Sequence, residues 1–128
     1  MGKVTTTERG WAGHFCCARQ CLFRRNTLVR KDGVGVVVST VGNYRTLGKN
    51  GFEMIGCDRY YETLVFKANM SDVYFDADIA EQVNFNSPWA ISDVNGDVDN
   101  RANAMHETVV KEIVGRMKAG EFDPETEK

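Results

Sequence analysis

The sequence lacks a long apolar run and has only two histidines. No stretch approaches the roughly 18 apolar residues that a membrane-spanning helix needs. The start, MGKVTTTERG, has no apolar segment of the kind that directs secretion. These absences predict a cytoplasmic chain, and because thiols stay reduced in that compartment, we expect its four cysteines to be free.

The glycine-containing stretch 42–51, GNYRTLGKNG, does not meet the requirements of a phosphate-cradling loop. Such a loop has four residues between its glycines and Ser or Thr after the lysine. Here five residues separate Gly42 from Gly48, and Asn50 follows Lys49. We therefore expect a flexible loop, able to contact a ligand, and no P-loop.

Two metal-dependent motifs are also incomplete. A zinc hydrolase that used His106 and the following glutamate would need a second histidine at position 110, which is Val110. The acidic run 93–99 begins like a calcium loop, but Val98 stands where glycine is required. With no nucleophile and base in a recognisable arrangement, we expect a protein without a cofactor that is not an enzyme.

The chain length, 128 residues, is that of one domain, which we place at residues 1–120, with a disordered acidic tail at 121–128. The net charge of −2 hides an asymmetry, because residues 1–64 carry +5 and residues 65–128 carry −7. Such a division either steers an anion to the first half, or lets one copy dock on another, or disappears when folding interleaves the two halves.

Alternating and β-branched stretches predict an antiparallel sheet of about five to six strands. Residues 3–9 suit an edge strand and residues 21–30 a second strand, with a tight turn at Asp32-Gly33. Residues 34–41 are β-branched almost throughout, which places them at the centre of the sheet. Residues 52–55 and 59–68 are predicted to pair as a hairpin, and Trp89 and Ile91 to anchor a later loop on the core.

One helix follows the acidic run. Apolar residues recur at helical spacing, and Asp99 or Asn100 is a suitable N-cap, with Gly120 closing the helix. The predicted buried stripe is Ala102, Met105, His106, Val109, Val110, Ile113, Val114 and Met117. Strands followed by one terminal helix, with no alternating βαβ pattern, predict an α+β fold in which the helix packs across one face of the sheet.

The stretch 10–30 gathers three of the four cysteines and one histidine. Zinc prefers four soft or borderline donors, usually delivered in closely spaced pairs. Cys17 and Cys21, together with His14, meet that need for half a site, while Cys57 and His106 are far away in sequence. These residues are candidate metal ligands, and the competing interpretation is that the cysteines are small buried apolar residues.

Arginines and aromatic residues alternate through the first half of the chain. Guanidinium groups offer forked donors to phosphate oxygens, and aromatic faces stack on bases. On a strand Arg24 and Arg25 point to opposite faces, so only one of them can join a given patch. The candidate ligand-binding residues for a nucleotide-type anion are Trp11, Arg24, Arg25, Arg45, Arg59, Tyr60 and Tyr61; the competing interpretation is an ordinary solvated surface.

Several phrases, ERGWAGHF, CLFRRNTL, VVVSTVG, RYYET and NRANAMHETVV, resemble a group of short uncharacterised reading frames of phages, prophages and gut-bacterial mobile elements. The resemblance covers roughly residues 7–114 and carries no catalytic residues. It implies a small accessory phage protein in the cytoplasm of a host cell, of the kind that blocks a host defence system.

The resulting hypothesis is a non-enzymatic binding protein, expected to be a homo-oligomer, that inhibits a bacterial defence system. It would either sequester a phosphate-bearing nucleotide signal or mask a host defence protein. One alternative is a metal- or thiol-dependent enzyme centred on His14–Cys21. Another is a structural or nucleic-acid-associated phage component, although the net acidity counts against DNA binding.

Overall fold

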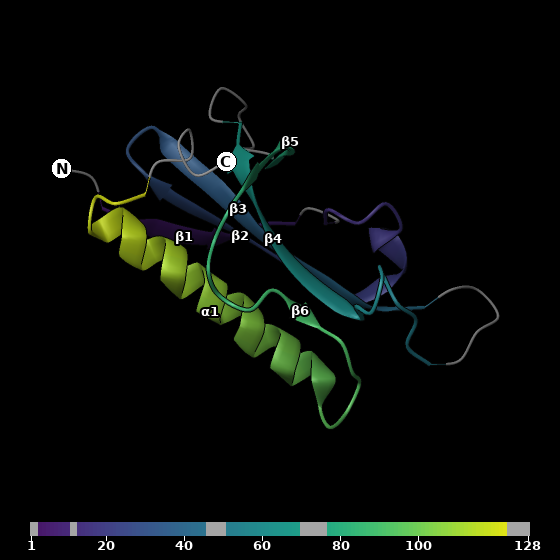
Figure 1. Ribbon diagram of the computed structural model, residues 1–128. Coiled ribbons are helices and arrows are strands. Elements are labelled where there is room, and N and C mark those ends of the chain that lie inside the picture. The colour runs from purple at the N-terminus through teal and green to yellow at the C-terminus, as the bar shows by residue number, and fades with distance from the viewer. Residues whose placement is uncertain (1–2, 11–12, 46–50, 70–76, 123–128) are drawn as a thin grey trace.

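The computed structural model describes residues 3–10, 13–45, 51–69 and 77–122. These residues form a six-stranded antiparallel sheet, a short 3-10 helix and a long α-helix (Figure 1). In chain order the elements are β1 (Thr5–Glu8), η1 (Ala18–Gln20), β2 (Cys21–Lys31), β3 (Val34–Tyr44), β4 (Tyr61–Ala68), β5 (Ala77–Val83), β6 (Ala90–Ile91) and α1 (Val98–Lys118). The predicted α+β fold is confirmed.

The sheet is a meander in which strands β1 to β5 lie in sequence order, and β6 pairs with the other end of β4. β1 is an edge strand, as predicted, and β3 is central and buried from residue 35 to residue 43. Asp32 supplies the positive φ, 56°, of the turn between β2 and β3. A run of valines pairs well at the centre because branched side chains pack closely on a pleated, covered surface.

The predicted hairpin between residues 52–55 and 59–68 is wrong. Its turn exists, since the Ile55 N–H donates to the Arg59 carbonyl at 2.8 Å, but the pairing does not continue along the arms. β4 instead pairs with β3, which places Thr63 opposite Thr40 and Val65 opposite Val38. β4 pairs with β3 because β3 is long enough to pair along all of it and has a matching β-branched face. The arm at residues 52–55 has only four residues and offers fewer cross-strand contacts.

Helix α1 lies across one face of the sheet, over β2, β3 and β4 (Figure 1). The predicted stripe is confirmed as its buried face, with Val114 partly buried. The N-cap is Asp97, whose side chain accepts from the Asn100 N–H at 3.2 Å, and not Asp99 or Asn100 as predicted. The helix begins earlier because Val98 is buried, so Asp99 falls in its first turn. In the part of the chain that is described, no helix is both long and apolar enough to cross a membrane.

Three predicted features lie wholly or partly outside the described residues: Trp11, the predicted loop at residues 46–50, and the tail at residues 123–128. The predicted loop that starts at Gly42 begins later, because β3 continues to Tyr44. Gly42 is therefore a strand residue, paired with Tyr61 of β4.

Gly42 allows a large ring to pack on strand β3 near its end. Tyr61 is fully buried, and a Cβ at position 42 would lie only 2.1 Å from its ring. We expect Gly42→Ala to destabilise the protein by about 2 kcal/mol, because the ring must move or the strands must separate. Chemical denaturation measures this, with Gly115→Ala as control, since a Cβ at 115 meets no atom within 4 Å. Equal stability of the two variants would contradict the close packing.

Candidate functional site

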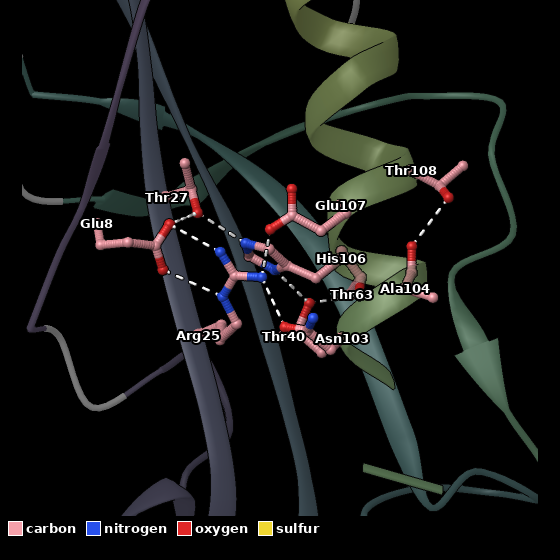
Figure 2. A network of polar contacts seen from close by, with 10 residues as sticks. All are labelled: Glu8, Arg25, Thr27, Thr40, Thr63, Asn103, Ala104, His106, Glu107 and Thr108. Carbon is pink, nitrogen blue, oxygen red and sulfur yellow. Dashed lines mark hydrogen bonds and ion pairs between the residues drawn. The ribbon is translucent and has the colours of Figure 1, made fainter. Parts of the chain in front are cut away.

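A buried histidine connects α1 to three strands (Figure 2). His106 has no exposed surface, and its Nδ1 lies 2.7 Å from Thr40 Oγ1. Its Nε2 lies 2.7 Å from Thr27 Oγ1, and the Thr40 and Thr63 hydroxyls are 2.6 Å apart. One imidazole thereby joins the helix to β2 and β3 directly and to β4 through a second hydroxyl.

The donors and acceptors in this hydrogen-bond network can be assigned from its outer end, at Glu8. The Thr27 hydroxyl donates to the Glu8 carboxylate, which can only accept when it is ionised. Thr27 Oγ1 must then accept from His106, so the imidazole carries its proton on Nε2 and accepts on Nδ1 from Thr40. Thr63 in turn donates to Thr40. Each hydroxyl or imidazole hydrogen in this network, from Thr63 to Glu8, therefore has a defined acceptor.

Arg25 closes the outer end of the same network. Its guanidinium donates to Glu8 at 3.1 Å, to Asn103 at 2.7 Å and to Glu107 at 2.5 Å (Figure 2). Burial opposes ionisation of Glu8, but hydrogen bonds from Arg25 and Thr27 outweigh it and lower the pKa of that carboxyl. Arg25, predicted to meet a ligand, here ties β1, β2 and α1 together, and joins the basic half of the chain to the acidic half.

The environment of His106 makes it a poor base. Burial, followed by the charge of Arg25, lowers its pKa from the ordinary 6.5 to about 4, although Glu8 and Glu107 act in the other direction. The imidazole is therefore neutral at pH 7 and closed to solvent. Its arrangement suits holding the helix on the sheet and does not suit proton transfer to a substrate.

A second polar cluster lies on the other side of the sheet, around His14. Its Nδ1 lies 2.9 Å from Ser39 Oγ and its Nε2 lies 2.9 Å from a Glu62 oxygen. Glu62 also accepts from Arg59 Nε at 2.7 Å. The order serine, imidazole, carboxylate is that of a hydrolase triad.

This second cluster does not present a nucleophile. Ser39 has no exposed surface. The imidazole comes from the segment that covers the serine, so any opening of that segment would separate base from nucleophile. The contacts instead fasten residues 13–20 to the sheet. Burial opposes ionisation of Glu62, but His14 and Arg59 outweigh it and lower its pKa.

The predicted metal ligands His14, Cys17 and Cys21 are not brought together as a three-donor site. Cys21 is buried, and that burial raises its pKa to about 11. Cys17 instead lies beside Cys16, with their Sγ atoms 3.8 Å apart, and Cys57 is exposed. Within the described ranges, no three His, Cys, Asp or Glu side chains gather around a position that could hold a metal ion.

Two predicted ligand residues, Arg45 and Tyr61, are each held by a different polar partner near the start of α1. The Tyr61 hydroxyl donates to Asp99, and Arg45 Nε donates to Asn43 at 2.7 Å. Burial and then Asp99 raise the pKa of Tyr61. Tyr60 packs partly buried against the same cluster, whereas Arg24 is exposed. The predicted ligand residues that the structure describes therefore do not all lie in one place: Tyr60 and Tyr61 share a cluster, while Arg25 and Arg59 have other partners.

A cleft lies at the edge of the sheet where β4 exchanges one partner for another. β5 pairs with β4 at residues 65–68, and β6 pairs with it at residues 61–62. The cleft has a volume of about 150 Å³ and is lined by Leu64, Gln82, Val83, Asn84, Phe85 and Trp89. Beside it, the Arg59 guanidinium lies 5.2 Å from the centre of the Trp89 ring.

Helix α1 fixes the loop that shapes this cleft. The Glu112 carboxylate accepts from the Asn86 N–H at 2.8 Å, and from the Ser87 N–H at 2.7 Å and hydroxyl at 2.6 Å. Burial opposes ionisation of Glu112, but these donors outweigh it and lower its pKa. Ile91 is buried as predicted, whereas Trp89 keeps 43% of its surface exposed. Sequence reasoning missed the cleft, and a tryptophan after a proline was its only signal.

The lowered pKa of His106 predicts a pH dependence of stability. In the unfolded chain the imidazole of His106 takes up a proton near pH 6.5, whereas in the folded chain it does so only near pH 4. The free energy of unfolding therefore falls as the pH decreases from 6.5 to 4. The loss from this residue is at most about 3 kcal/mol. Denaturation curves of the wild type and His106→Gln, between pH 7 and pH 4, measure the difference. Parallel curves would contradict a histidine that is buried neutral.

Comparison of the chain with family models, with curated proteins and with solved structures finds no match. A proposal for its function must therefore rest on the chemistry of its own residues.

Proposed function

We propose that the protein is a small, non-catalytic binding protein whose ligand is a phosphate-bearing nucleotide, held with its base in the cleft beside Trp89. With the phage resemblance of the sequence, this makes it an inhibitor that sequesters a nucleotide signal of a bacterial defence system. The observation that carries the proposal is an exposed aromatic cleft with a guanidinium at its border.

The size and lining of the cleft suit a planar ring. An apolar cavity of about 150 Å³ holds a benzene-sized molecule. Trp89 and Phe85 supply aromatic surface, and base–aromatic stacking is worth about 1–3 kcal/mol per base. The amides of Gln82 and Asn84 each offer a donor and an acceptor, which is what the edge of a base requires.

Arg59 supplies the positive charge for the phosphate. It is one of the ligand residues predicted from the sequence, and its guanidinium lies over the ring of Trp89, which lines the cleft. Its Nε is used by Glu62, but a guanidinium has five N–H donors and can hold a carboxylate and meet a phosphate oxygen together. The pairing with Glu62 also fixes the side chain before the ligand arrives, which reduces the entropy cost of binding.

The two histidine clusters support a binding role over a catalytic one. His106 and Ser39 have no exposed surface, and the carboxylates around them accept from neighbouring side chains. The polar groups suited to acid–base chemistry thus face one another across packed elements, whereas the aromatic cleft faces solvent.

Calorimetric titration with adenosine and guanosine monophosphate tests the proposal. We expect binding that weakens as salt is raised, since a phosphate meets Arg59. Trp89→Ala should weaken binding about tenfold or more, because one stacking surface is lost. Arg59→Ala should weaken it and remove most of the salt dependence. Arg24→Ala, an exposed arginine on β2, is the matched control and should bind as the wild type does.

The absence of binding by both nucleotides, or equal loss in the Arg24 and Arg59 variants, would contradict the proposal. The absence of nucleotide binding would favour the alternative, in which the protein masks a host defence protein. The surface for it would be the groove of about 240 Å³ between α1 and β6, lined by Pro88, Ala90, Ile91, Arg101, Ala104, Met105 and Thr108.

A further inference from the structure

We propose that Cys16 and Cys17 are one half of a tetrahedral zinc site that is completed by the same two cysteines of a second copy of the chain. The inference is independent of the nucleotide cleft, because it concerns the segment between β1 and η1. It rests on the separation of the two sulfur atoms, the contacts that hold the segment carrying them, and the shortage of further metal-binding donors around them among the described residues.

The separation of the thiols suits one ion between them. Their Sγ atoms lie 3.8 Å apart. With zinc–sulfur bonds of about 2.3 Å, that separation gives a sulfur–zinc–sulfur angle of about 111°, close to the tetrahedral value. The pair therefore needs little movement to become a chelate.

The segment that carries the thiols is held from both sides. Gly13 packs so closely on Val41 that a Cβ would lie 2.5 Å from that side chain, and its φ of 116° favours glycine. His14 is bonded to the sheet, and the Phe15 ring lies edge-on to Tyr44 at 5.2 Å between centroids. Ala18 is buried directly after the pair. Cys16 remains exposed on this support.

A disulfide between the two residues is disfavoured by the backbone. Consecutive Cα atoms across a trans peptide are about 3.8 Å apart. Disulfides usually join Cα atoms about 4.4–6.8 Å apart. The described peptide bonds are all trans, so the adjacent cysteines stay available as thiols.

The other two ligands must come from outside the described part of one chain. His14 is already bonded at both ring nitrogens, and Cys21 is buried. A structural zinc site needs four ligands, and a two-fold arrangement of the exposed Cys16 and the partly buried Cys17 supplies four thiolates. On binding, the four thiols release four protons and no electron is transferred.

Two large exposed apolar residues adjoin, in sequence, members of the core cluster that lies under the thiol segment. Leu22, which is 71% exposed, follows the buried Cys21. Met54, 47% exposed, precedes Ile55, which packs against the cluster formed by Ala18, Cys21 and Val41. The predicted homo-oligomer would then be a dimer joined at the metal.

The test adds zinc to the reduced protein in a phosphine reductant and measures mass by native mass spectrometry and metal by elemental analysis. We expect a dimer with one zinc for two chains, returning to monomer with a chelator. Cys16→Ser and Cys17→Ser should each lower zinc affinity at least tenfold. Cys57→Ser, an exposed cysteine elsewhere, is the control and should leave it unchanged.

Cobalt in place of zinc gives a second measurement, since four thiolates in a tetrahedron produce intense visible absorption. Unchanged metal binding in the Cys16 or Cys17 variant would overturn the site. One zinc per monomer would overturn the shared arrangement, and so would a dimer that persists with the chelator.

Discussion

The structure depends on one buried imidazole. His106 meets hydroxyls of β2 and β3 on its two ring nitrogens and through them fixes the helix over the middle of the sheet. A buried polar group without partners costs about 1–3 kcal/mol, so the helix can occupy only the register in which both nitrogens are satisfied. Apolar packing of valines, Ile113 and Met117 supplies the attraction between helix and sheet, and the imidazole selects the position. Arg25 also fixes the edge strand β1 in this arrangement, because its guanidinium donates to Glu8.

This constraint separates the side chains that hold the fold from those that meet other molecules. The histidines, Arg25, Ser39 and Glu62 hold elements together from the two sides of the sheet. The features proposed to bind a ligand or a metal are positioned by these contacts, as when Glu62 holds Arg59 beside Trp89. Glu112 holds the loop of the aromatic cleft against the helix, and His14 holds the segment that presents the two adjacent thiols. Among the described residues, charged groups around the two histidines join the elements of the fold, and the groups proposed for binding are mainly aromatic, amide and thiol side chains.

Local pattern is sufficient to predict most of the fold. The β-branched run of β3, the alternation of β2 and the apolar stripe of α1 each depend on nearby residues, and each is predicted correctly. The sequence pattern places Gly42 in a loop, because its need for space comes from Tyr61, a partner fixed only by strand register. The alternation of side chains along β2 correctly places Arg24 and Arg25 on opposite faces. It does not predict the partners of Arg25, because they lie on β1 and α1, far away in sequence. The cleft arises where β4 changes from β5 to β6, and no local pattern describes a change of partner.

The most direct test of the role of His106 is the nitrogen NMR spectrum of its side chain as a function of pH. The hydrogen-bond directions require a neutral ring with its proton on Nε2, accepting at Nδ1, from pH 8 down to about pH 5. We predict that tautomer, with protonation only near pH 4. A proton on Nδ1, or titration near the ordinary value of 6.5, would show that the imidazole does not join the helix to the sheet in the way described.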